Sequence, residues 1–367
     1  DQPLDKEARL HDYKIDAVRA FARANKIDKI ITSGGPNPKV GIISTGKSYL
    51  DVRGAMDLLG IDEVGANEKG LRLYKVGMPW PLEPEGIKEF AKGLDLIIVV
   101  EEKRALIEAQ LKEILYDLSD RPQVVGKRDE YGQWLFPAKA ALETNEVAVA
   151  VGERLIQAEL GGEGIKHLVS DLKRLRGNKP VTPEAFIRTP YFCAGCPHNS
   201  STKVPDGSHA FAGIGCHYMA VWMDRSTEGF THMGAEGANW VGEFPFSTRD
   251  HVFQNLGDGT YIHSGSLAIR SAVAANTNVT YKVLYNDAVA MTGGQSLDGG
   301  QTPQSIAAQL VAEGVKRVDV VTDEPEKYGA NSGFPQGVKI HHRRDLMTVQ
   351  KELSKVEGVS AMVYDQT

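Results

Sequence analysis

Hydrophobic and polar positions in the first half of the chain alternate between two periods. Short runs rich in β-branched residues predict strands at 40–45, 71–76 and 94–100. Amphipathic stretches between and after them predict helices at 48–59, near 85–92 and at 104–118. Strands that alternate with helices in this way are typical of α/β units. The first half is therefore predicted to fold around a parallel sheet.

A weaker helical zone at 143–174 is followed by a cluster of residues that break helices. The cluster consists of Gly177, Asn178, Pro180, Pro183 and Pro190. We therefore place a linker at about 175–190, between a first domain at 1–175 and a second at 185–367.

The second half repeats the α/β pattern, with strands predicted at 252–256, 280–284 and 318–321 and helices between them. The predicted fold class is thus α/β, with two domains of mainly parallel sheets flanked by helices. Gly, Asn, Asp and Thr crowd the loops of the second domain at 257–259, 286–295 and 298–301. Because such sheets bind ligands at the carboxyl ends of their strands, this domain is expected to hold the site.

Charge and hydropathy exclude several classes of partner. The net charge of -6 and a pI near 6.0 argue against a nucleic-acid-binding surface. No apolar run approaches the roughly 20 residues that span a bilayer, and the first residues do not resemble a signal peptide. We expect a cytoplasmic protein that neither binds nucleic acid nor enters a membrane. Because it begins without Met, in a charged helix-like segment, we also expect it to be a piece of a longer protein.

The strongest chemical motif is Gly257-Asp258-Gly259, directly after the predicted strand at 252–256. Glycines let a backbone approach a phosphate, and a carboxylate is a hard ligand for Mg²⁺. Gly-Asp-Gly is also a common turn. The context favours a site, because Asn286 follows the next strand and would face Asp258 at the same sheet edge. Asp258, the Asn286 amide oxygen and a main-chain carbonyl would complete a magnesium site around a diphosphate.

Three cysteines, Cys193, Cys196 and Cys216, are the only ones in the chain. Cys193 and Cys196 share one Cys-x-x-Cys turn, which directs two thiols at one centre, and Cys216 lies on a separate loop. An odd count is a poor disulfide framework. Ligation of a metal or cluster, a redox dithiol and unrelated buried thiols remain as alternatives.

Two other patterns are judged not to be sites. Gly41 to Ser48 match the P-loop consensus, but Ile42 and Ile43 continue the strand that begins at Val40, which leaves only Thr45-Gly46 as loop. His341-His342-Arg343-Arg344 is predicted to be a solvated strand edge. Among the other histidines, His217 is the candidate catalytic residue because it follows Cys216, whereas His232, His251 and His263 are interpreted as surface or loop residues.

The span from Gly257 to Asn286 resembles the thiamine-diphosphate fingerprint, and residues 286–295 resemble the 2-oxoacid:ferredoxin oxidoreductases. This resemblance implies that Asp258 and Asn286 bind Mg²⁺ by their side chains and Ala288 by its carbonyl. It further implies a set of residues near the cofactor. They are Gly257, Gly259 and Thr292 along the diphosphate, Thr260 in the first turn, and Met291 near the thiazolium.

Cys193-Ala-Gly-Cys196-Pro-His and Gly-Ile-Gly-Cys216-His resemble the cluster-binding segments of indolepyruvate ferredoxin oxidoreductases. The resemblance implies a [4Fe-4S] cluster held by four cysteines, three of them Cys193, Cys196 and Cys216. The chain stops at Thr367, and in the long fused members a cysteine is expected immediately after such an ending. We therefore expect the three sulfurs to converge and Thr367 to lie near them.

The segments at 75–82 and 99–104 look like the transketolase-C-terminal-like domain of the same oxidoreductases, which implies a role of domain 1–175 in interdomain packing. The whole enzyme implied by the resemblance oxidatively decarboxylates an aryl 2-oxoacid of the indolepyruvate or phenylpyruvate type to the arylacetyl-CoA. Its electrons pass through the cluster to ferredoxin, and coenzyme A takes the acyl group.

The implied partners are a pyrimidine-binding domain and a gamma-type domain of the same enzyme, in a homo-oligomer or multi-chain assembly; without them this chain is expected to be inactive. Two alternatives stay open. One is a non-oxidative thiamine-diphosphate-dependent decarboxylase or synthase, which needs no clustered cysteines. The other is a non-catalytic fragment that binds no cofactor alone.

Overall fold

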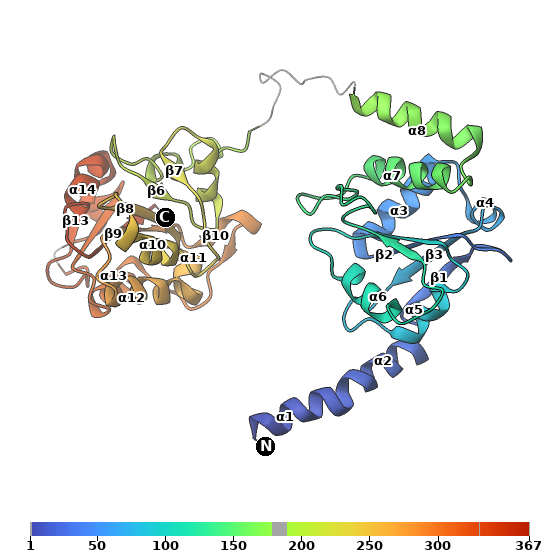
Figure 1. The fold of residues 1–367 in the computed structure, drawn as a ribbon. Helices are drawn as coiled ribbons and strands as arrows, with labels where there is room; N and C mark the ends of the chain where they lie inside the picture. The colour runs from blue at the N-terminus through green and yellow to red at the C-terminus, as the bar shows by residue number, and fades with distance from the viewer. Residues whose placement is uncertain (1, 178–188, 330, 367) are drawn as a thin grey trace. The chain divides into compact units, whose positions relative to one another are not determined.

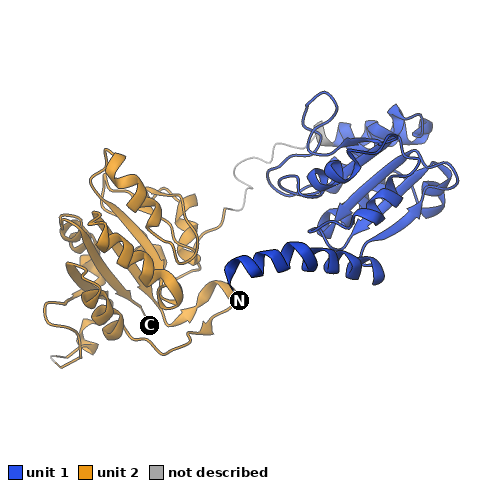
Figure 2. Ribbon diagram, turned by 60° about the horizontal axis from the view of Figure 1, so that its bottom comes forward, with its two compact units in different colours: residues 1–181 blue, residues 182–367 orange. Residues whose placement is uncertain are grey.

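The computed structural model describes residues 2–177, 189–329 and 331–366, and the chain folds as two units, Asp1–Val181 and Thr182–Thr367 (Figures 1 and 2). Each unit is built on one main sheet, so the predicted fold class of two mainly parallel sheets flanked by helices is confirmed. The proposed linker at 175–190 lies largely outside the described residues. No described helix is long and apolar enough to cross a membrane.

Unit 1 contains a five-stranded sheet in the order β1-β3-β2-β4-β5. These strands are β1 (Lys29–Ser33), β2 (Val40–Thr45), β3 (Leu71–Val76), β4 (Leu96–Val100) and β5 (Gln123–Val125). The edge strand β1 is antiparallel to β3, whereas the other strands are parallel. The β1 strand was not predicted.

Helices cover both faces of this sheet, which explains why β2 is apolar at successive positions. Ile42 packs into a core with α3 (Gly46–Leu58) and α7 (Thr144–Gln157). Ile43, pointing to the opposite face, packs with α5 (Pro84–Ala91) and α6 (Ile107–Leu115). The remaining helices of unit 1 are α1 (Pro3–Arg9), α2 (Ile15–Ala24), α4 (Glu63–Glu68) and α8 (Gly162–Gly177).

Unit 2 contains a seven-stranded, all-parallel sheet in the order β13-β12-β14-β9-β8-β6-β7. Its strands are β6 (Ala210–Phe211), β7 (Thr227–Glu228), β8 (Val252–Gly257), β9 (Val279–Tyr285), β12 (Arg317–Thr322), β13 (Lys339–His342) and β14 (Val359–Asp365). In the register, Gly257 lies opposite Leu284 and Asp365 lies opposite Tyr285. The carboxyl ends of β8, β9 and β14 therefore meet at one edge.

Helices cover both faces of this sheet, and the hydrophobic core is larger on one face than on the other. Helices α12 (Ser266–Ala274) and α13 (Pro303–Ala312) contribute Ile269 and Ile306 to the larger core. Helix α14 (Leu346–Leu353) packs against Leu284 and Met362 on the other face. A two-stranded ribbon, β10 (Ala288–Val289) with β11 (Gln295–Ser296), follows β9.

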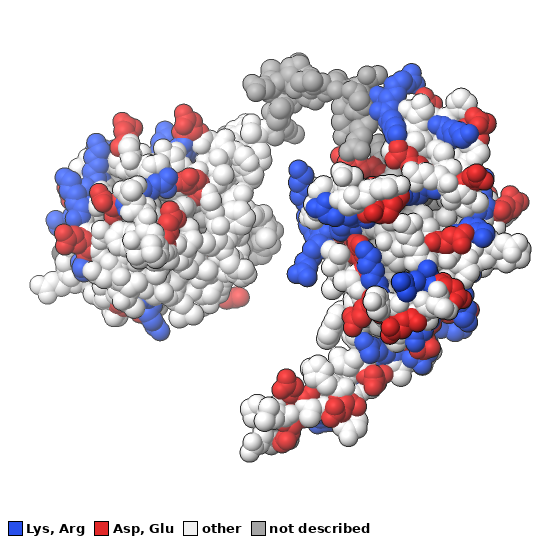
Figure 3. All heavy atoms as spheres, viewed as in Figure 1, with Lys and Arg blue, Asp and Glu red and all other residues white. Residues whose placement is uncertain are grey.

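On the face that Figure 3 shows, basic and acidic side chains of unit 1 are interspersed.

In the P-loop-like segment of unit 1, the strand continues through Gly41 as the sequence predicted, but Thr45 and Gly46 do not form the expected loop. Strand β2 runs through Gly41 to Thr45, and α3 begins directly at Gly46. A Cβ atom on Gly41 would lie 2.7 Å from Phe90 Cζ of α5, so this glycine permits close strand–helix packing. The Lys47 ammonium lies 2.9 Å from the Asp51 carboxylate and 3.3 Å from that of Glu102. The half-exposed Lys47 side chain is thus engaged by two carboxylates of its own unit.

We expect Lys47→Ala to leave the affinity for ATP unchanged and negligible. The variant should instead melt at a lower temperature, because Asp51 is buried and loses its cationic partner. Titration calorimetry with Mg·ATP and a thermal melt would check both parts. Tight ATP binding that disappears in the variant would show that the segment is a nucleotide site.

Candidate functional site

A cavity of about 340 Å³ opens at the carboxyl edge of the unit 2 sheet. All eight residues that the resemblance implied near the cofactor line it, namely Gly257, Asp258, Gly259, Thr260, Asn286, Ala288, Met291 and Thr292. His198, Cys216, His217 and Asp298 also line it, together with apolar side chains that include Ile214 and Leu297. The cavity therefore has a polar end at the strand termini and a largely apolar wall.

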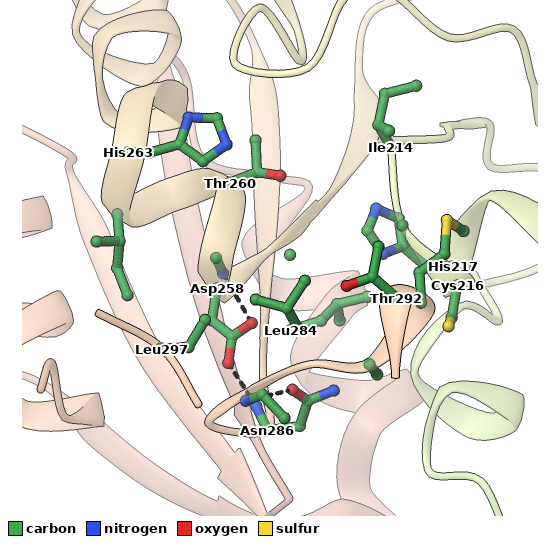
Figure 4. A pocket seen from close by; sticks show the side chains of 18 of the residues that line it. Ile214, Cys216, His217, Asp258, Thr260, His263, Leu284, Asn286, Thr292 and Leu297 are labelled. Carbon is green, nitrogen blue, oxygen red and sulfur yellow. Dashed lines mark hydrogen bonds between the residues drawn. The ribbon is translucent and has the colours of Figure 1, made fainter. Parts of the chain in front are cut away.

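Asp258 joins the two turns that end β8 and β9. Its Oδ1 accepts a hydrogen bond from the Gly259 N–H at 2.8 Å, and its Oδ2 accepts from the N–H groups of Asn286 at 2.8 Å and Asp287 at 2.9 Å (Figure 4). Burial raises the pKa of this carboxyl, and the three backbone donors oppose that effect. The parallel pairing of β8 with β9 aligns these turns, so the contact follows from the sheet.

The Asn286 side chain is oriented by two neighbours. Its Oδ1 accepts from the Ala288 N–H at 3.1 Å, and its Nδ2 lies 3.3 Å from the Nε2 atom of His198. Asp287, which lies between Asn286 and Ala288 in the chain, has φ 53°, a left-handed conformation that turns the chain sharply at the end of β9. The turn places Asn286 and Ala288 on the same cavity.

His217 is buried in the cavity wall, and its Nε2 has no hydrogen-bond partner. Burial, together with the charge of His198, lowers the pKa of His217 to about 3, so its ring is neutral at physiological pH. A Cβ atom on Gly213 would lie 2.7 Å from this Nε2, and one on Gly215 would lie 2.6 Å from Cε1. The Gly-x-Gly pattern before Cys216 therefore makes room for the imidazole.

The cysteine segments lie in one region of unit 2. The Cys196 N–H donates to the Cys193 carbonyl at 3.0 Å, which closes a tight turn. Burial raises the pKa of the Cys216 thiol, and the charges of Cys196 and Cys193 raise it further. Of the three, Cys216 lines the cavity.

In the described part of the chain, no three His, Cys, Asp or Glu side chains are arranged to hold a metal ion. Thr367, which we expected near the thiols, lies outside the described residues. The convergence of the three sulfurs on one centre therefore stays a prediction.

Comparison with known proteins assigns a family to each unit. Residues 30–179 match the indolepyruvate oxidoreductase domain, and residues 213–363 match the C-terminal TPP-binding domain of thiamine pyrophosphate enzymes. This is an indolepyruvate oxidoreductase-like chain. Its second unit is a thiamine-diphosphate-binding domain, as the Gly-Asp-Gly and Asn286 motif predicted.

Relatives of this indolepyruvate oxidoreductase-like chain are longer than it is. Indolepyruvate oxidoreductase subunit IorA of Thermococcus kodakarensis is 27% identical over 91% of this chain and 50% of its own length. The subunit of the same name from Pyrococcus horikoshii is 26% identical over 96% of this chain and 53% of its own. The chain thus spans about half the length of these relatives.

Among solved structures, a 2-oxoglutarate:ferredoxin oxidoreductase from Magnetococcus marinus aligns with a TM-score of 0.38 and 18% identity. The alignment covers 50% of this chain and 65% of that one.

His198 of this oxidoreductase-like chain was not singled out by the sequence, although it contacts a predicted magnesium ligand. It is buried beside the cavity, where burial lowers its pKa to about 4. Its Nδ1 lies 3.3 Å from Ser201 Oγ, and its ring centroid lies 6.3 Å from that of His217. The signal that was available is its place in Cys-Pro-His, directly after a cysteine turn.

The other histidines correct part of the sequence interpretation. His251 is mostly buried: its Nε2 lies 2.7 Å from Thr280 Oγ1, and burial lowers its pKa to about 4. His341 is also not simply solvated, because its Nε2 lies 3.3 Å from the buried carboxylate of Asp319. His263 is exposed as expected but lines the cavity, whereas exposed His232 does not.

Proposed function

We propose that this chain binds the diphosphate of thiamine diphosphate together with Mg²⁺ at the cavity of unit 2. The observation that carries the proposal is the pair Asp258 and Asn286, which lie on adjacent turns, are linked by a hydrogen bond and line one cavity. We further propose that the chain is part of a thiamine-dependent oxidoreductase for an aryl 2-oxoacid. The relatives named indolepyruvate oxidoreductase support this substrate class.

The donor set at the strand ends fits a hard cation. A carboxylate has about four acceptor positions, and Asp258 uses three of them, so one remains for a metal. Asn286 Oδ1 accepts one hydrogen bond and keeps a second lone pair, and the Ala288 carbonyl supplies a third oxygen. Mg²⁺ prefers a few such oxygens plus substrate phosphates. A bound cation would also offset the desolvation of the buried Asp258 charge.

His217 supports a bound cofactor independently of the metal ligands. An imidazole nitrogen that is buried without a partner is costly, unless a ligand supplies the missing hydrogen bond. The Nε2 atom of His217 is such a nitrogen on the cavity wall. We assign the neutral His217 ring the role of forming a hydrogen bond through Nε2 with the bound cofactor or its substrate. When bound, the thiamine ring supplies the electron sink for decarboxylation.

We propose that Cys193, Cys196 and Cys216 are ligands of a [4Fe-4S] cluster whose fourth cysteine is supplied from outside this chain. The effect of the Cys193 and Cys196 charges on the pKa of Cys216 supports the proximity of these two thiols to Cys216. Such a cluster would pass electrons singly to ferredoxin, and coenzyme A would take the acyl group. The proposed enzyme also requires a pyrimidine-binding domain and a gamma-type domain in addition to the two units described.

Titration calorimetry of the full chain with thiamine diphosphate, with and without Mg²⁺, tests the central proposal. We expect saturable binding that requires Mg²⁺. No heat of binding at any Mg²⁺ concentration would favour the alternative of a fragment that binds no cofactor alone.

We expect Cys196→Ser to lower the iron retained after anaerobic reconstitution with iron and sulfide, because a cluster loses one of its thiolates. Iron and acid-labile sulfide per chain, with broad visible absorption, are the measurements. Far-UV circular dichroism of the variant controls for folding. If the wild-type chain retains no iron, the non-oxidative thiamine-dependent enzyme is the better description.

A further inference from the structure

We infer that His198 is a positioning residue, which holds the Asn286 amide so that its oxygen faces the cation and which ties the cysteine turn to the diphosphate site. The inference rests on the proposed function and concerns a residue that does not itself contact the cation. It is carried by a chain of hydrogen bonds that fixes first the orientation of the Asn286 amide and then the tautomer of the His198 imidazole. In each of these hydrogen bonds, only one of the two atoms can be the donor once the preceding bond is assigned.

The first bonds orient the amide. The Ala288 N–H can only donate, so the atom that faces it at 3.1 Å must be the Asn286 oxygen. The Asn286 nitrogen therefore faces His198 Nε2 at 3.3 Å. An amide nitrogen can only donate, so Nε2 must be the unprotonated, accepting nitrogen of the ring. Without this acceptor only the Ala288 N–H holds the amide, which is then freer to rotate away from the orientation that directs its oxygen at the cation.

The last bond completes the tautomer. A neutral imidazole that accepts at Nε2 carries its hydrogen at Nδ1. Nδ1 lies 3.3 Å from the Ser201 hydroxyl, which can accept that hydrogen. Ser201 is fully buried and belongs to the same short helix, α9 (His198–Ser201), so the acceptor is held in place. Outer partners of this kind orient the ligand that binds the metal.

The same helix connects His198 to the cysteine turn. The Asn199 N–H donates to the Cys196 carbonyl at 3.1 Å, and the Ser201 N–H donates to the Pro197 carbonyl at 3.1 Å. Thr202 Oγ1 donates to the His198 carbonyl at 2.7 Å. These bonds leave the imidazole little freedom relative to Cys196. A single rigid turn thus carries a predicted cluster ligand and the partner of a predicted magnesium ligand.

A buried histidine can also simply fill a core, and His251 provides the comparison. The His251 ring is likewise mostly buried, and its Nε2 is hydrogen-bonded to the side chain of Thr280. Neither His251 nor Thr280 lines the cavity. His198 differs because its Nε2 partner, Asn286, lines the cavity at the proposed metal site. Replacing either histidine removes a buried ring, but only the replacement of His198 also removes the acceptor for the Asn286 amide.

The experiment compares His198→Leu, which removes the acceptor, with His198→Gln, whose side-chain oxygen can occupy the Nε2 position. The Mg²⁺ concentration required for half-saturation is measured by calorimetry on the full chain at saturating thiamine diphosphate. We expect an increase of roughly 10- to 100-fold for His198→Leu, in line with the loss of other outer partners of metal ligands. His198→Gln should restore most of the affinity.

His251→Leu is the matched control, expected to lower the melting temperature but to leave the Mg²⁺ requirement unchanged. If His198→Leu does not fold, His198→Asn replaces it, because its shorter side chain presents an acceptor near Nδ1 only. Failure of the wild-type chain to bind thiamine diphosphate would overturn the proposed function and this inference together. Wild-type binding with an unchanged Mg²⁺ requirement in the variants, or an equal loss in His198→Leu and His198→Gln, would overturn this inference alone.

Discussion

Replacing Asp258 with alanine is expected to abolish Mg²⁺-dependent binding of thiamine diphosphate. The change deletes the only charged ligand among the three proposed oxygens, and the flanking glycines have no side chains that could replace it. It also leaves the N–H groups of Gly259, Asn286 and Asp287 without their acceptor, so the turns after β8 and β9 lose their link. The loss should exceed the roughly 10- to 100-fold that removal of an outer partner costs.

Asp298→Ala is the matched control, because Asp298 is a second carboxylate on the same cavity but is exposed. Calorimetric titration of both variants with thiamine diphosphate and Mg²⁺ separates a local role of Asp258 from a general effect of charge. A small, equal decrease in the two variants would contradict the assignment of Asp258 to the first coordination sphere. A large decrease confined to Asp258→Ala is the expected result.

The sequence predicted the elements around this site because their signals are local. The apolar run before Gly257 and the next one before Asn286 each define a strand from its own residues, and the structure has β8 and β9 at those positions. Two parallel strands that are consecutive and adjacent bring their ends together. The pairing of Asp258 with Asn286 therefore needed no information from distant parts of the chain.

Features that depend on distant contacts could not be predicted in this way. Strand β14 comes last in the chain but inserts between β9 and β12, an order that local periodicity does not encode. His251 lies in a polar stretch, so the sequence suggested exposure, and His198 was not singled out at all. Their burial comes from other segments, since His251 packs against Thr280 on β9 and His198 against Asn286. The predicted convergence of the Cys193–Cys196 turn with Cys216 would depend on the same kind of long-range packing.

Lys282, in the middle of β9, is another feature that the sequence did not reveal, and it leads to an expected effect on stability. Its side chain is fully buried, and its Nζ donates to the Lys203 carbonyl at 3.1 Å. Burial, with a smaller effect of the nearby Arg225 charge, lowers the pKa of Lys282 to about 7 from the ordinary 10.5. Below pH 7 the folded protein therefore buries the positive charge of Lys282, which is solvated in the unfolded chain.

The direction of the pH dependence follows from which state binds more protons. Between about pH 7 and 10.5 the unfolded chain keeps Lys282 protonated while the folded protein loses the proton. The free energy of unfolding should therefore rise with pH in this window, by up to about 1.4 kcal/mol per pH unit from this residue. Below about pH 7, where both states keep the proton, the destabilisation is fully present.

Lys282→Met is expected to stabilise the protein at pH 7 by about 1 to 4 kcal/mol, the range seen when buried charges are replaced by apolar side chains of similar volume. The Lys203 carbonyl keeps a partner in the variant, because Gln350 Nε2 also donates to it at 3.2 Å. Urea denaturation at pH 7, 8 and 9 measures the change, followed by tryptophan fluorescence, to which fully buried Trp240 contributes from unit 2. Exposed Lys351→Met is the control. The stabilisation should shrink as pH rises, and a gain that stays constant with pH would mean that the charge of Lys282 is not its cause.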